Sequence, residues 1–350
     1  MAYTNIDDPS AYFQALAYTA STATPSQTFT NDGNSDLKPD LLWVKNRSGW
    51  GSRNHVLWDS SRGTNANLTP NETTAEQTTS YQTFNTNGFT VPEGFATAYS
   101  APYVAWQFKA NGGTTASNTD GNTTTTVQAN QDAGFSIVTY TGTGSGSQTM
   151  GHGLGVTPNI VLTKARSGTS NWSFNGNFGG MTYGTNRLLL NTTAALTADT
   201  NEVTAASSTT FTGGGSSGVN SNGSTFVAYC FAEKQGYSKF GKYVGNGSAN
   251  GAFVYTGFKP AFFLLKKTSA ADGWRLFDNK RAGYNDDNYR LAPDATDAED
   301  TATTYLDILS NGVKIRGTAG SFNQSGGTFI YMAFAEHPFV NSKGVPTTAR

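Results

Sequence analysis

The sequence predicts an all-β protein built from three tandem antiparallel β-sandwich domains. A seven-residue pattern, with Pro at its start and Lys at its end around an apolar run, occurs as Pro39–Lys45, Pro158–Lys164 and Pro260–Lys266. A second apolar run closes each copy, as Val104–Phe108, Val227–Phe231 and Ile330–Phe334. The distance from Pro to closing Phe is 69, 73 and 74 residues in the three copies. Repeats of this length exceed those of solenoid proteins and are long enough to fold as domains.

We therefore divide the chain at the edges of these repeats. The expected parts are unit 1 (1–110), a linker or arm (111–133), unit 2 (134–236), unit 3 (237–340) and a polar tail (341–350). The linker is expected because Val127 is its only large aliphatic residue and threonine fills 123–126. The junction between units 2 and 3 is much shorter, which predicts a fixed relation between those two units.

Composition favours strands and excludes several classes of protein. Charged residues make up 13% of the chain, about half the usual share, while aromatic residues also reach 13%. The net charge is −1 and no basic cluster is present, which argues against a nucleic-acid partner. No apolar run is long enough for a membrane span. The first residues lack the pattern of a signal peptide, so we expect synthesis and folding in a cytosol.

Within each unit, short apolar runs between turn residues predict strands. The turn pairs Asn87-Gly88 and Asn311-Gly312 each lead into alternating apolar residues, which indicates hairpins in units 1 and 3. Residues 292–304 are interpreted as an ordered loop, because Pro293 and the threonines oppose a helix. About a hundred residues of short strands indicate an antiparallel sandwich or jelly roll.

The repeated runs are apolar on both alternating faces. Along 329–334, odd- and even-numbered side chains are equally apolar, whereas a strand that faces one core shows polar residues on its other side. We expect these strands to pack also against another domain, a covering loop or another subunit. On this basis we expect a homo-oligomer, a trimer if the protein is a fibre.

Catalytic, cofactor and metal motifs are not found. The three histidines, His55, His152 and His337, have no spacing of a metal pair or catalytic triad, and a structural role is expected for each. We expect no cofactor and no enzymatic activity. Acidic residues gather at 286–300. This stretch is interpreted as either a calcium-binding loop or a solvated acidic loop, and the solvated loop is favoured because EF-hand spacing is absent.

Aromatic residues provide the candidate ligand-binding site. Trp43, Trp58 and Trp106 lie in strand-like runs and are expected in the core. Trp50, Trp172 and Trp274 lie in turn-rich stretches, where exposed rings could contact a glycan, but the edge of the core is favoured for Trp274. Binding to other molecules is expected in the loops at 48–53 and 279–304, which differ most between units. The residues proposed to contact a ligand are Trp50, Arg281, Tyr284 and Tyr289.

Several segments resemble repeat domains of tailed-phage virion proteins, especially those of marine cyanophages and related podoviruses. They are His152–Lys164, Trp274–Asp278, Phe329–Phe339 and Gly344–Arg350. The resemblance implies concanavalin-like or jelly-roll domains on the virion, in a tail fibre, an appendage or the capsid surface. Unit 1 departs from the pattern, because it lacks Gly-Leu-Gly before Pro39 and ends without Ala-Glu after Phe108. That departure suits a domain that docks onto the particle.

The expected function is therefore that of a non-enzymatic virion surface protein. Host attachment is favoured over capsid decoration, and an enzyme that depolymerises glycans is the competing class. Other virion proteins are the expected partners, together with a host cell-surface glycan or receptor.

Overall fold

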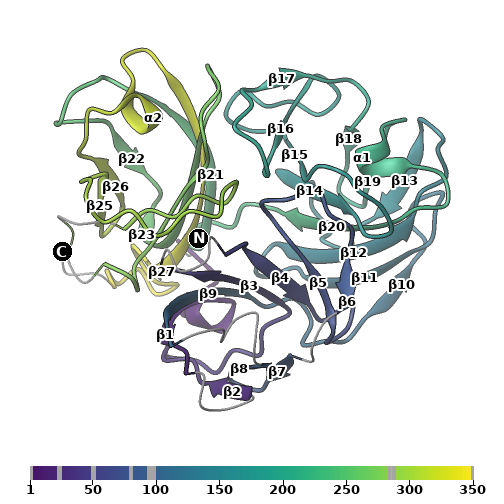
Figure 1. Ribbon diagram of the computed structural model, residues 1–350, viewed down its shortest axis with the longest axis horizontal. Helices are drawn as coiled ribbons and strands as arrows, with labels where there is room; N and C mark the ends of the chain where they lie inside the picture. Colours follow the sequence, from purple (N-terminus) through teal and green to yellow (C-terminus); the bar gives the residue numbers. More distant parts are fainter. Residues whose placement is uncertain are drawn as a thin grey trace.

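The computed structural model describes residues 3–21, 26–48, 53–78, 82–92, 100–282, 285 and 289–347. Throughout these ranges the strands pair only in antiparallel sheets, which confirms the predicted all-β class. The helical structure in the described part of the chain consists of single turns, η1 (Pro9–Ala11), α1 (Ser217–Asn220) and α2 (Gly320–Asn323). Three lobes surround a common centre, and each lobe corresponds to one repeat unit (Figure 1).

Unit 1 forms one large and one small sheet. The large sheet has the order β1-β9-β3-β4-β5-β6 and the small sheet the order β2-β8-β7. The large-sheet strands are β1 (Phe13–Thr19), β3 (Leu41–Asn46), β4 (Val56–Asp59), β5 (Ala66–Leu68), β6 (Gln77–Thr78) and β9 (Pro102–Phe108). The small-sheet strands are β2 (Ser26–Phe29), β7 (Thr83–Asn85) and β8 (Gly88–Pro92).

Unit 2 repeats this arrangement with a larger sheet. Its sheets have the orders β10-β11-β12-β20-β14-β15-β16-β17 and β13-β19-β18. The large-sheet strands are β10 (Ala116–Asn118), β11 (Thr125–Asn130), β12 (Phe135–Thr141), β14 (Ile160–Ala165), β15 (Ser173–Gly176), β16 (Asn186–Leu189), β17 (Thr197–Ala198) and β20 (Thr225–Phe231). The small-sheet strands are β13 (Gln148–Gly151), β18 (Val203–Ala206) and β19 (Thr210–Gly213).

The large sheet of unit 3 has four strands, fewer than those of units 1 and 2. Its sheets have the orders β21-β27-β23-β24 and β22-β26-β25. The large-sheet strands are β21 (Ser238–Val244), β23 (Phe258–Lys267), β24 (Arg275–Asp278) and β27 (Thr328–Pro338). The small-sheet strands are β22 (Phe253–Tyr255), β25 (Leu306–Leu309) and β26 (Gly312–Ile315).

The repeated sequence patterns occupy matching places in the three large sheets. In each sheet the closing run lies between the Pro-to-Lys strand and the strand that opens the repeat, which is β1, β12 or β21. The register also matches, with the residue two positions after Pro opposite the closing Phe: Leu41 with Phe108, Ile160 with Phe231, and Phe262 with Phe334. The sequence repeats therefore correspond to repeated topology and register.

Each unit buries a core between its two sheets. In unit 3, for example, Phe263 and Phe329 of the large sheet pack in one cluster with Val254, Val313 and Ile315 of the small sheet. Comparable clusters fill units 1 and 2. One face of every central strand is thus covered inside its own unit, as expected for a sandwich.

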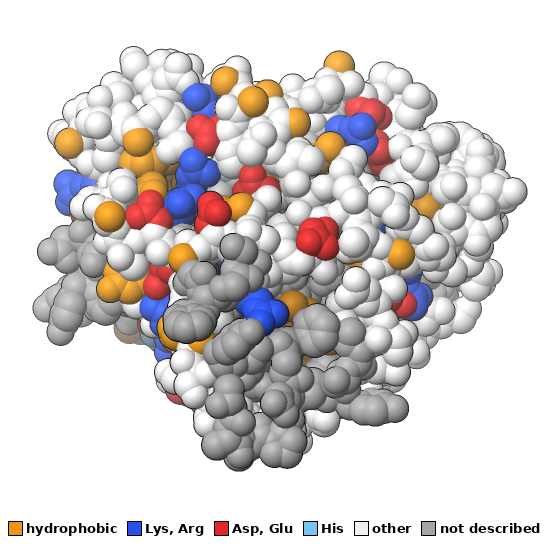
Figure 2. All heavy atoms as spheres, viewed as in Figure 1, with side chains coloured by type: hydrophobic (Ala, Val, Ile, Leu, Met, Phe, Trp, Pro, Cys, Tyr) orange, Lys and Arg blue, Asp and Glu red, His pale blue; other side chains and the backbone are white. Residues whose placement is uncertain are grey.

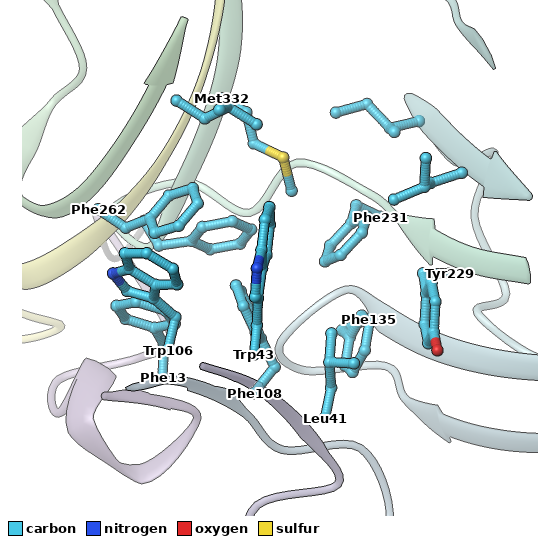
Figure 3. Close-up of a cluster of buried hydrophobic side chains, with 14 of the residues drawn as sticks. Phe13, Leu41, Trp43, Trp106, Phe108, Phe135, Tyr229, Phe231, Phe262 and Met332 are labelled. Atoms are coloured by element: carbon cyan, nitrogen blue, oxygen red, sulfur yellow. The ribbon is translucent and has the colours of Figure 1, made fainter. Parts of the chain in front are cut away.

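The opposite faces of the three large sheets meet in a fourth, shared core (Figure 3). At its centre Phe108, Phe231 and Phe334 form a triangle, with ring centroids 5.0 to 5.9 Å apart. A cavity of about 30 Å³ beside this triangle is lined only by apolar and aromatic residues of all three units, a lining that keeps such a space dry. The two apolar faces of the repeated strands are explained by this core, which confirms the expected packing against another unit.

The interval 111–133 is not the linker that we expected. It contains β10 and β11, and β11 pairs with β12 from Thr126–Thr139 to Asn130–Phe135. Val127 is buried against the core of unit 2, and the threonine run is compatible with extended backbone. The interval therefore extends the large sheet of unit 2.

Both Asn-Gly pairs form the expected hairpins. Asn85 pairs with Gly88 between β7 and β8, and Leu309 pairs with Gly312 between β25 and β26. At Gly88 the backbone has φ 100°, and a Cβ there would lie 2.0 Å from the Phe29 carbonyl oxygen. Glycine is required at this position by both the conformation and the close approach of β2.

Candidate functional site

The 279–304 loop, one of the two loops expected to bind a ligand, contacts unit 1 at Arg47, the residue before the other loop. Glu299 of the 279–304 loop donates its backbone N–H to the Arg47 carbonyl, and the Arg47 guanidinium lies 6.0 Å from the centre of the Tyr289 ring. Trp50 and Tyr284 lie outside the described residues. Arg47, which directly precedes the 48–53 loop, therefore lies beside Tyr289 and Glu299 of the 279–304 loop.

Arg281 is buried in an ionic network at this interface. Its guanidinium donates to Asp278 at 2.6 Å and to Glu299 at 2.7 Å, both in unit 3. From unit 1, Arg47 donates to both oxygens of Glu299, and Trp106 Nε1 donates to Asp278 at 2.9 Å. Arg281 is thus a structural residue, and its assignment to an exposed ligand site was wrong.

A matching network joins unit 1 to unit 2. Arg62 donates to Asp59 and, at 2.9 Å, to Glu76. From unit 2, Arg166 donates two bonds of 2.8 Å to Glu76, and the Tyr229 hydroxyl donates to Asp59 at 2.6 Å. Burial alone would raise the pKa of Glu76, but the two guanidinium groups hold the pKa below its ordinary value.

The third interface, between units 2 and 3, replaces this network with apolar side chains. One backbone hydrogen bond is common to all three interfaces. The N–H of Glu76 donates to the Arg166 carbonyl, that of Glu299 to the Arg47 carbonyl, and that of Leu196 to the Thr268 carbonyl. Two positions of the network have lost their polar groups at this interface. Met332 of β27 occupies the position of Trp106 and Tyr229 on the other two closing strands. Gly176, the last residue of β15, occupies the position of Asp59 and Asp278 at the ends of β4 and β24. Apolar residues can replace a buried ionic group without loss of stability.

In the described part of the acidic loop, Asp294, Glu299 and Asp300 are paired and not simply solvated, whereas Asp297 is exposed; Asp286 and Asp287 lie outside the described residues. Glu299 is paired as described, and Asp300 accepts from the Tyr305 hydroxyl and the Ala302 N–H. Asp294 is largely buried and accepts from the Trp274 N–H, and burial raises the pKa of its carboxyl group. Among the described residues no group of three or more His, Cys, Asp or Glu could hold a metal ion.

The Lys that ends each repeated pattern reaches into the neighbouring unit. Lys45 donates to the Thr296 carbonyl at 3.1 Å, Lys164 to Thr73 at 3.2 Å and Lys266 to Thr193 at 3.0 Å. Unit 1 thus contacts unit 3, unit 2 contacts unit 1, and unit 3 contacts unit 2. Burial lowers the pKa of all three amines from 10.5 to about 8.

A second set of cyclic contacts is made by the residue before β4, β15 and β24, the strands that pair with the Pro-to-Lys strands. His55 Nε2 lies 2.9 Å from the Ala292 carbonyl, Trp172 Nε1 donates to Thr69, and Trp274 Nε1 donates to Leu189, both at 2.9 Å. All three side chains are buried, as are the expected core residues Trp43, Trp58 and Trp106. Burial lowers the pKa of His55 well below its ordinary value, which is consistent with the structural role that we expected.

A polar pocket of about 130 Å³ lies elsewhere on the interface between units 1 and 3. The polar residues among its lining are Ser10, Gln14, Asp32, Asn34, Asn279, Lys280, Glu336 and His337. No repeated motif pointed to it, because its walls come from five separate stretches of the chain. Only the proximity of the two units in the fold reveals this site.

The chain belongs to a family described as a domain of unknown function (DUF7483), which matches residues 8–338. Searches of curated proteins and of solved structures found no match. None of the helices in the described ranges is long and apolar enough to cross a membrane.

Proposed function

We propose that this protein is a non-enzymatic surface protein of a tailed-phage virion, built from three tandem β-sandwich domains and used for attachment to the host. The shared strand order and register of the three sheet pairs support the tandem-domain interpretation. The sequence resemblance of units 2 and 3 to phage virion repeats supports the location.

The observation that carries the proposal is the closure of three lobes around one aromatic core within a single chain. Such a body is a rigid support for variable loops, which is what an attachment protein requires. On the face in Figure 2, positive side chains lie beside negative ones and hydrophobic side chains are scattered. A mixed surface of this kind suits a protein that works at high local concentration on a particle.

The two glutamates at the unit interfaces, Glu76 and Glu299, do not suit the acid and base roles of the competing glycan depolymerase. Glu76 and Glu299 are each held by two arginines, so neither is free to exchange protons with a substrate. Incubation of the purified protein with host envelope polysaccharide is the direct test. Shorter polysaccharide chains would establish the enzyme and reject our proposal.

Location and attachment are tested on intact particles. We expect gold-labelled antibodies against the protein to bind the tail or its appendages in electron micrographs, and purified protein to compete with particles for adsorption to cells. Labelling of the head without such competition would establish capsid decoration instead. No label on the particle would reject both forms of the proposal.

We also propose a homo-oligomer, which would be a trimer in a fibre, although the apolar faces of the central strands no longer support it. The second apolar face of the central strands is covered by the other two units of the same chain. Assembly on a particle, with unit 1 as the docking part, is the remaining support for this prediction.

A further inference from the structure

We infer that the polar pocket between units 1 and 3 binds a neutral, hexose-sized sugar residue. This inference rests on the proposed attachment function and names the ligand class that one site would recognise. One wall is formed by unit 1 through β1 and residues 32–34. The other is formed by unit 3 through Ala261, residues 279–280 and residues 335–337.

The matching place between units 1 and 2 is filled by a side chain of the protein itself. Ser60 and Ser61 follow Asp59 as Asn279 and Lys280 follow Asp278. Both serine hydroxyls accept from Gln128 Nε2 of β11, at 2.9 and 2.8 Å. At the interface of units 1 and 2, β11 of unit 2 therefore fills this place with a hydrogen-bonding side chain. At the interface of units 1 and 3, the same place is the open pocket.

Among the described residues of unit 1, no strand corresponding to β11 closes the pocket. The described residues before β1 form the turn η1, and the stretch from Gly33 to Ser35 bonds to Gln14 of β1. Asn279 lines the pocket, and within the described part of the chain its buried Oδ1 atom has no hydrogen-bond partner. An unmatched buried acceptor of this kind is satisfied by a ligand that donates a hydrogen bond.

The charges of the pocket select a neutral ligand with several hydroxyl groups. Asp32 and Glu336 oppose an anion, whereas Lys280 opposes a cation. Lys280 also pairs with Asp32 at 3.0 Å, so an exposed ion pair joins the two walls. Hydroxyl groups can donate to Asn279 and the carboxylates and accept from Lys280, and the volume of about 130 Å³ suits one sugar ring.

The test is a titration of the full chain with glucose, galactose, mannose and N-acetylglucosamine, followed by saturation-transfer NMR. We expect at least one sugar to bind with a Kd on the order of 1 mM. Asn279→Ala should weaken this binding at least tenfold, as should Asp32→Asn, which changes an exposed side chain. The matched control is Asp132→Asn in the separate pocket beside Tyr3 and Lys234, and it should bind as the wild type does.

Failure of this inference is distinguishable from failure of the proposed function. If none of the four sugars binds, or if both pocket variants bind like the wild type, the inference is wrong, whatever the particles do. If Asn279→Ala abolishes sugar binding while particles carrying it adsorb normally, the pocket stands as a sugar site and its role in attachment is rejected.

Discussion

Replacement of Phe334 by Ala tests whether the three units share one core. The ring lies within 6.0 Å, centre to centre, of six other aromatic rings, from all three units: Phe13, Phe108, Phe231, Tyr237, Phe240 and Phe262. Emptying a buried Phe site costs about 3–5 kcal/mol, and aromatic pairs add about 0.5–1.5 kcal/mol each. We expect the free energy of unfolding to fall by about 5 kcal/mol, near the upper limit, because the surrounding aromatic rings are too rigid to move in and fill the cavity.

The assay is urea unfolding followed by both fluorescence and circular dichroism. Since Phe334 contacts all three units, we expect one cooperative transition that moves to lower urea as a whole. Phe253→Ala is the matched control, because that ring is 46% exposed and its loss should cost less than about 1 kcal/mol. A loss below about 1 kcal/mol for Phe334→Ala, or separate unfolding of unit 3 alone, would refute the shared core.

Four further results are expected. Glu299→Leu should lower the free energy of unfolding by about 3 kcal/mol, because the half-buried Arg47 loses its carboxylate partner and the buried Arg281 keeps only the carboxylate of Asp278; a change below about 1 kcal/mol in urea unfolding would contradict this. Between about pH 8 and 10 the free energy of unfolding should rise, because the unfolded chain binds protons that the three buried lysines have released in the folded state. Replacement of all three by Met should remove most of that rise, and an unchanged pH profile would show that the lysines do not cause it. The double change Tyr284→Ala and Tyr289→Ala should preserve folding and reduce particle adsorption; unchanged adsorption with normal assembly would exclude this loop as the receptor contact. Light scattering should show an oligomer at micromolar concentration, and a stable monomer would favour a decorating protein held by the capsid.

The strands were predictable because local patterns specify them. Alternation, turn pairs and the Pro-to-Lys spacing located the strands that carry Leu41, Ile160 and Phe262, whereas their common register emerged only from the structure. The side chains that are apolar on both faces correctly indicated a second packing surface. They could not identify that surface, because an apolar face packs equally well on another unit, a loop or another subunit.

The ionic partners were not predictable from the sequence. Arg47 and Glu299 are 252 positions apart and meet only because the chain closes on itself. Without that closure the acidic residues of 286–300 have the composition of an exposed loop, which is why a solvated loop was favoured. The error at 111–133 has a related cause, since a polar strand at a sheet edge needs few large aliphatic residues.

The shared aromatic core has a consequence for the order of events during synthesis. Phe108 leaves the ribosome more than two hundred residues before Phe334, one of the rings that must cover it. At about 5–20 residues per second, unit 1 stays uncovered on that side for roughly 10–45 s. During this interval its inner sheet face is open to other nascent chains, and prompt arrival of the last strand decides whether the molecule closes on itself or associates with its neighbours.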